Sequence, residues 1–346
     1  MNVKFFLSDV HACGMVRGEV PARAINQIRS DCRVDCKSDI LCSDFFKTDL
    51  MVFQRSHRPD IYQKMLAAKS MGIKTVYEID DDMLNMPEDF DEPYKFYKKP
   101  EVRETMLKFL RNVDAVTVST VTLGESIRKM TPRPSYVVEN AIDLDRWRGA
   151  QLARDVRLSS DPPDTVTIGW MASGSHLIDI PIVDRALCDL LQAHSNVRLM
   201  FIGNLTLAHL AKYGLAKYGD RMTFLPWTEI NELPFQMAKF DITIAPLIDC
   251  PFNVCKSPLK WMQANALGIP GVYSDLPLYR DICTNGVDGF LALPGQWKEP
   301  LEALVKDAKL RKRISVSGFQ KVQQWDILKT AGNWVAAWRQ IMSIWM

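Results

Sequence analysis

The chain has 346 residues, 47% hydrophobic and 24% charged, values near the globular average that exclude a disordered or fibrous protein. Its 43 basic and 41 acidic side chains leave a formal charge of +2, which excludes a polycation but not a local basic groove. Apolar runs are too short to span a bilayer and no leader pattern follows Met1, so we expect a soluble cytoplasmic protein. The eight cysteines form no Cys-x-x-Cys pair and are expected to be reduced thiols.

Through the first half of the chain, short β-rich runs alternate with amphipathic ones. Apolar residues follow one another within the β-rich runs, which is typical of parallel strands covered on both faces. The pattern predicts strands at 3–10, 49–55, 74–80, 115–120 and 135–139, and helices at 21–30, 61–71 and 102–112.

A polar, proline-broken stretch at 150–163 has the composition of a linker, and the alternation resumes beyond it. The last segment, 327–345, carries an apolar stripe at helical spacing, so we expect a helix packed on the body. The alternative is a face for a partner or a membrane surface. Between linker and last helix, the pattern predicts strands at 166–172, 197–203, 222–226, 242–246, 271–274 and 289–293, and helices at 180–193 and 258–267.

This alternation indicates βαβ units and an α/β fold. Because the pattern starts again after the linker, we predict two Rossmann-like, doubly wound domains that face a cleft. We place the N-terminal domain at 1–150, the C-terminal domain at 164–325, and the amphipathic helix at 326–346.

The predicted helix at 258–267 carries the most informative residues. Ser257 is a good N-cap and Gly268 a good C-terminal stop, so the helix is well bounded. Lys256 and Lys260 flank its first turn, where the helix dipole normally disfavours cations. A shared anion such as a diphosphate would account for them; the alternative is two solvated lysines.

Three adjacent carboxylates, Asp80, Asp81 and Asp82, follow the predicted strand at 74–80. Residues at the carboxyl end of a parallel strand face the crevice where α/β ligands bind. Their mutual repulsion must be offset by a metal, a basic neighbour, hydrogen bonds or water. The alternatives are a metal–nucleotide site or a solvated acidic turn.

Two loops rich in small residues follow the first strand of each half. In the second half, Ser173 and Gly174 allow close approach of a ligand, and His176 could donate to a phosphate or a sugar hydroxyl. In the first half, Gly14 and Arg17 could face the same cleft. Neither loop has the Gly-x-Gly-x-x-Gly spacing of a dinucleotide site.

Together these segments resemble a GT-B-fold glycosyltransferase close to retaining family 4 (group 1), in particular its short bacteriophage-type members. The order and spacing of the segments carry the resemblance, which covers nearly the whole chain. They are Arg17 before Pro21-Ala22, Val76–Asp82, Ala115–Thr120, Val138–Asp145, Ile168–His176 and Lys256–Val272.

The resemblance implies that the C-terminal half binds the donor and the N-terminal half the acceptor. Lys256 and Lys260 would contact the diphosphate, Gln263 the ribose, and the catalytic set would be Lys256, Lys260 and Asp81. The donor set adds Asn140, Ser173, Gly174 and His176, and the acceptor side consists of Gly14, Arg17, Asp80, Asp81 and Asp82. The chain departs from the family's Glu-x7-Glu pattern, since Cys255 and Gln263 occupy those positions.

We therefore predict a glycosyltransferase, retaining and without a bound metal or cofactor, with a UDP-sugar as cosubstrate. The acceptor is open: a hydroxymethylated pyrimidine in phage DNA, a glycan or a protein. A basic and aromatic run at 94–111 is either a nucleic-acid contact or a solvated insertion. The rival functions are a metal-dependent transferase using Asp80–Asp82, a non-catalytic binding protein, and a periplasmic-type ligand-binding protein.

Overall fold

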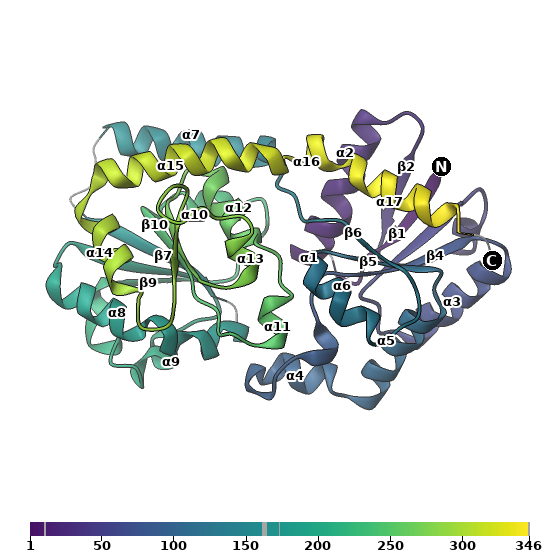
Figure 1. Ribbon diagram of the computed structural model, residues 1–346, viewed down its shortest axis with the longest axis horizontal. Coiled ribbons are helices and arrows are strands. Elements are labelled where there is room, and N and C mark those ends of the chain that lie inside the picture. Colours follow the sequence, from purple (N-terminus) through teal and green to yellow (C-terminus); the bar gives the residue numbers. More distant parts are fainter. Residues whose placement is uncertain (10–11, 161–164, 173, 345–346) are drawn as a thin grey trace.

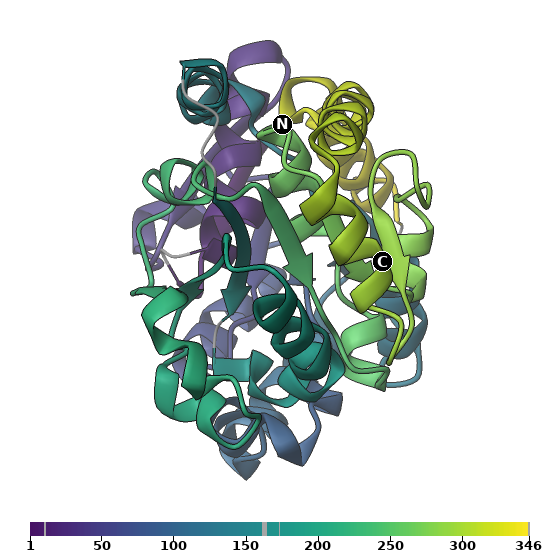
Figure 2. The ribbon, with the colours of Figure 1, turned by 90° about the vertical axis from the view of Figure 1, so that its left-hand side faces the viewer.

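The computed structural model describes residues 1–9, 12–160, 165–172 and 174–344. It confirms the predicted α/β class, with two parallel six-stranded sheets in separate halves of the molecule (Figure 1). Figure 2, seen from the side of the C-terminal half, shows helices on either side of that half's sheet. No helix in the described ranges is long and apolar enough to cross a membrane.

The N-terminal sheet has the strand order β2-β1-β3-β4-β5-β6. All five residues of β3 are buried, as expected for a central strand covered on both faces. The strands are β1 Asn2–Phe6, β2 Arg33–Lys37, β3 Leu50–Gln54, β4 Lys74–Ile79, β5 Ala115–Val118 and β6 Ser135–Val137. The helices include α1 Ala12–Gly14, α2 Val20–Ile28, α3 Pro59–Ser70, α4 Glu92–Tyr97, α5 Pro100–Asn112 and α6 Val121–Arg128.

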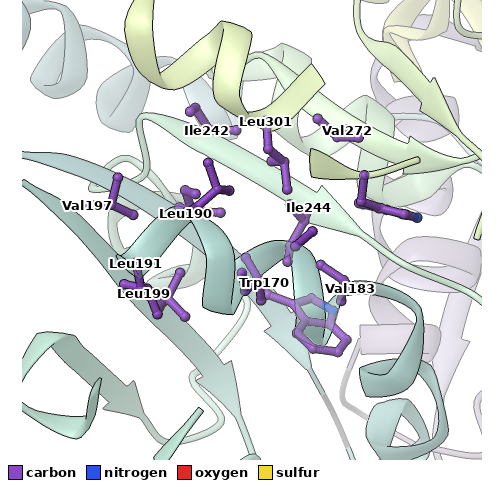
Figure 3. Packing of buried hydrophobic residues seen from close by; sticks show 14 of the residues in the cluster. Trp170, Val183, Leu190, Leu191, Val197, Leu199, Ile242, Ile244, Val272 and Leu301 are labelled. Carbon is purple, nitrogen blue, oxygen red and sulfur yellow. The ribbon is translucent and has the colours of Figure 1, made fainter. Parts of the chain in front are cut away.

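The C-terminal sheet has the order β12-β11-β10-β7-β8-β9. Its strands are β7 Val166–Ala172, β8 Val197–Gly203, β9 Met222–Leu225, β10 Ile242–Ala245, β11 Gly271–Ser274 and β12 Phe290–Ala292. The helices include α8 Ile180–Ala193, α9 Leu207–Ala211, α10 Leu233–Met237, α11 Pro251–Val254, α12 Leu259–Ala266, α13 Pro277–Arg280, α14 Lys298–Lys306 and α15 Ala308–Val322. Trp170, Leu190 and Ile244 meet in the core between this sheet and its helices (Figure 3).

The linker predicted at 150–163 is wrong for most of its length, because α7 (Leu144–Ser160) is a helix. Trp147, Ala150 and Arg154 recur at helical spacing and are buried. Arg154 Nε donates to the carbonyl of Phe240 at 3.3 Å, so a charged side chain belongs to the buried face. The polar composition of the segment therefore describes a partly charged helix.

The last segment packs on the body, as predicted, but as two helices, α16 (Ile327–Thr330) and α17 (Gly332–Met342). They leave the C-terminal half and lie against α2 of the N-terminal half (Figure 1). Trp334 of α17 meets the ring of Phe5 edge-on at 6.0 Å between centroids. Residues far apart in sequence thus complete one core.

Strand β2 is not predicted from the sequence, and the first strand ends at Phe6 and not at Val10 as predicted. Strand β2 lies at the edge of the sheet, and its exposed positions are polar. Only Val34 among its five residues is buried, so it lacks the apolar run that identified the central strands.

Candidate active site

A cavity of about 230 Å³ lies between the carboxyl ends of the two sheets. The N-terminal half contributes residues that follow β1, β4 and β6, and the C-terminal half contributes residues at or after the ends of β7, β8, β9, β10 and β11. This is where doubly wound sheets bind ligands. The polar lining includes Asp80, Asp81, Asn140, His176, Thr228, Glu229, Lys256, Ser257, Lys260, Gln263 and Tyr279.

Lys260 on helix α12 and Lys256 just before the helix both line the cavity, but the N-cap of the helix differs from the prediction. The helix begins at Leu259 with Pro258 as N-cap, and Ser257 does not cap it. The Ser257 hydroxyl instead accepts a hydrogen bond from Asn140 Nδ2 at 2.6 Å. Gly268, with φ of +62°, follows the helix as predicted.

Lys260 belongs to a chain of hydrogen bonds that includes the predicted residue His176. Lys260 Nζ lies 2.8 Å from His176 Nε2 and donates to the Met171 carbonyl at 2.9 Å. His176 Nδ1 lies 2.7 Å from Asp179 Oδ2. When Lys260 is protonated, its ammonium can only donate, so His176 Nε2 is then the acceptor and its Nδ1–H donates to Asp179.

Burial shifts the pKa of each of these three hydrogen-bonded side chains. It lowers the pKa of Lys260 to about 7, an effect that nearby Lys256 reinforces. Burial, together with the two lysines, also holds the pKa of His176 well below its usual value. Burial raises the pKa of Asp179 to about 7, although the lysines act against it. Such clustered shifts are typical of functional sites.

The three adjacent carboxylates point in different directions. Asp80 pairs with Arg55 Nη1 at 3.2 Å, and Asp81 lines the cavity. Asp82 Oδ2 accepts from Ser126 Oγ at 2.5 Å, away from the cavity. Burial raises the pKa of Asp81, and Lys256 only partly offsets it. Within the described ranges, no group of three His, Cys, Asp or Glu side chains could hold a metal ion.

Arg17 is buried beneath the cavity rather than lining it. Its guanidinium pairs with Glu78 at 2.7 Å, donates to Asn140 Oδ1 at 2.9 Å, and lies 4.6 Å from the ring centre of Trp334. Arg17 thus fixes Asn140, which itself lines the cavity.

The remaining predicted residues divide between the cavity and its surroundings. Gln263 lines the cavity, whereas Cys255 is buried with its Sγ 3.8 Å from Asp82 Oδ2. Gly14 supports the wall: its N–H donates to Asp9 Oδ1 at 3.2 Å, and a Cβ there would meet the Asp9 carbonyl oxygen at 1.9 Å. Gly174 begins the 3₁₀ turn that carries His176, and Ser173 lies outside the described residues.

Three parts of the site were not predicted from the sequence. Trp227 and Glu229, in the loop after β9, line the cavity, and Trp227 is 53% exposed. Tyr279 enters from α13, and Asp179 stands three residues after His176. An aromatic residue directly after a predicted strand, and an acid at helical spacing from a histidine, were the available signals.

Part of the basic and aromatic run at 94–111 makes contacts within the protein. Tyr94, Phe96 and Tyr97 pack against the N-terminal core. Lys95 pairs with Asp91 and Glu92, and Lys108 with Glu104. Arg103 donates to the Leu84 carbonyl at 2.6 Å. Lys98, Lys99 and Arg111 of the same run are exposed, so only part of the run is engaged within the protein.

The C-terminal half of the chain is similar to a known protein family. Residues 166–319 match the family model described as "Glycosyl transferases group 1". Comparison with curated proteins finds no match.

Solved structures match along nearly the whole chain. HepE from Anabaena, in complex with UDP-glucose, shares 12% identity over 98% of this chain and 100% of its own, with a TM-score of 0.68. Sucrose-phosphate synthase from Thermosynechococcus elongatus shares 12% identity over 99% of each chain, with a TM-score of 0.69. A glycosyltransferase from Rickettsia africae shares 12% over 99% of this chain and 98% of its own, at 0.68. The chain thus has the GT-B glycosyltransferase fold, and its C-terminal half carries the sequence pattern of group 1 glycosyltransferases.

Proposed function

We propose that the protein transfers a sugar from a UDP-sugar to an acceptor hydroxyl. The observation that carries the proposal is the cavity between the two sheets, where Lys256, Lys260 and Gln263 face Asp81. The UDP-glucose complex of HepE, a protein of the same fold, supports this class of donor.

The two lysines suit the charge that develops in the reaction. When the sugar leaves, negative charge grows on the diphosphate, and cations already in place stabilise it by a few kcal/mol each. Lys256 and Lys260 line the same cavity, Lys256 just before helix α12 and Lys260 in its first turn. We assign them to the diphosphate.

Other lining residues are assigned by their chemistry. The amide of Gln263 offers both a donor and an acceptor to the ribose hydroxyls, and Asn140 lies beside Ser257 at the same wall. We assign the acceptor to the N-terminal side, with Asp81 close to its reacting hydroxyl. The family resemblance adds retention of the anomeric configuration and independence of metal.

The test is a panel of sugar nucleotides measured by thermal stabilisation, since a ligand that binds only the folded state raises the melting temperature. We expect UDP-sugars to stabilise and their nucleoside monophosphates to do so less. Donor hydrolysis, the anomer formed, and activity in chelator then test turnover, retention and metal independence. Absence of stabilisation by every sugar nucleotide contradicts the proposal.

A non-catalytic binding protein is the second candidate, and Gln263 favours it. The resemblance places a glutamate at this cavity-lining position, and the amide carries no charge. Stabilisation by a sugar nucleotide without hydrolysis or transfer to glycan, protein or hydroxymethylated DNA acceptors would support this candidate.

A further inference from the structure

Both ends of the chain formed by Asp179, His176 and Lys260 are fixed to the backbone. The N–H of Ile248 donates to Asp179 Oδ1 at 2.8 Å, and Lys260 Nζ donates to the Met171 carbonyl at 2.9 Å. Asp179 is 1% exposed and His176 6% exposed, while Lys260 also lines the cavity. These three hydrogen-bonded side chains therefore connect the interior of the C-terminal half to the cavity wall.

Among the described residues, no carboxylate is in direct contact with Lys260, although a half-buried ammonium usually has such a partner. Its acceptors in this chain are a neutral carbonyl and a neutral imidazole, and the carboxylate of Asp179 stands beyond the imidazole. Two N–H bonds of the ammonium are used in this way, and a third remains for a ligand. An anion in the cavity would supply the missing compensation.

We infer that Asp179 and His176 are positioning residues that hold Lys260 toward the cavity, and that a diphosphate, on binding, draws a proton into this chain. This role rests on the proposed function, because the diphosphate belongs to the proposed UDP-sugar. It adds a proton linkage and a role for Asp179 that the fold alone does not imply.

The charges around the chain determine the sign of the linkage. Lys256 and Lys260 repel each other, and among the described residues Lys256, Tyr279 and Cys250 are the other titratable groups that interact with the three members. The pKa values of Lys260 and Asp179 are both about 7, so these hydrogen-bonded side chains are incompletely protonated near neutral pH. A diphosphate favours the protonated form of each group, so binding takes up protons and affinity falls as pH rises.

The test is calorimetric titration of the intact protein with UDP-glucose between about pH 6 and pH 9, in buffers of different ionisation enthalpy. The diphosphate of this ligand carries no secondary phosphate ionisation, so the proton signal belongs to the protein. We expect proton uptake near neutral pH and above, and a Kd that rises by up to about tenfold per pH unit.

Three variants test which residues cause the pH dependence of the affinity. Asp179→Asn removes the charge that favours the ammonium, so the loss of affinity should begin at lower pH. Lys260→Arg keeps a permanent cation and should flatten the profile. Asp189→Asn, on helix α8, whose N-cap residue is Asp179, is in an exposed pair with Lys298 and should behave as wild type. Melting temperatures verify that each variant is folded.

Lysine ¹³Cε spectra follow the same titration without ligand. The signal lost in Lys260→Arg should titrate near pH 7 in the wild type and at lower pH in Asp179→Asn. A Kd independent of pH, buffer-independent heats, or an Asp179→Asn profile equal to wild type would overturn the inference and leave the proposed function intact. Failure of every sugar nucleotide to bind would overturn the proposed function, and the linkage with it.

Discussion

At the scale of single residues, Lys256 and Lys260 have different surroundings although both line the cavity. Lys256 lies 4.6 Å above the ring of Phe252, whereas Lys260 is bonded to Met171 and His176. We expect Lys256→Ala and Lys260→Ala each to weaken UDP-sugar binding and to reduce transfer about tenfold or more. Titration and initial rates measure both effects. Wild-type affinity and turnover in the two variants would refute the assignment to the diphosphate.

Substitutions of Gln263 test how helix α12 is placed relative to the nucleotide. If its amide bonds the ribose, Gln263→Ala should weaken donor affinity by about five- to tenfold, the equivalent of one hydrogen bond. Gln263→Glu should retain binding, since a carboxylate accepts from the same hydroxyls. Gln320→Ala, exposed on α15, is the matched control. Loss of binding in Gln263→Glu would mean that the nucleotide lies elsewhere.

At the scale of elements, α17 stabilises a half of the molecule distant from it in sequence. Trp334 is 2% exposed and packs on Phe5 and Arg17. Trp334→Ala should lower the free energy of unfolding by about 3–5 kcal/mol, measured by denaturant titration. Trp227→Ala, at a half-exposed position of the cavity, should leave stability nearly unchanged and alter donor binding instead. Equal stability of both variants would argue against this role of α17.

The elements also show which parts of the fold could be predicted from the sequence. Helix α8 was predicted to the residue, because its stripe includes Val183, Leu187 and Leu190, buried at helical spacing. Helix α7 was misassigned because its buried face includes Arg154. At the site, Lys260 and Gln263 were placed by local spacing, whereas the Arg17–Glu78 pair joins residues 61 apart and leaves no local pattern.

At the scale of the whole molecule, the hydrogen bond between Asn140 and Ser257 joins the two sides of the cavity. Asn140 Nδ2, held from behind by Arg17, donates to Ser257 Oγ beside helix α12. A double-mutant cycle of Asn140→Ala and Ser257→Ala should give a coupling of about 0.5–1.5 kcal/mol in UDP-sugar affinity. Thr122→Ala, outside this pair, supplies the uncoupled control with Ser257→Ala. Strict additivity of the Asn140 and Ser257 changes would mean that the contact does not contribute to binding.

The packing of α17 on the first half has a consequence for synthesis on the ribosome. Chains emerge from the N-terminus, so β1 and α2 leave the exit tunnel before the whole second half has been made. The apolar surface that Trp334, Trp338 and Ile341 later cover is therefore exposed throughout that interval. The half that is translated first is the last to be completed, and during that time its surface is open to chaperones and to aggregation.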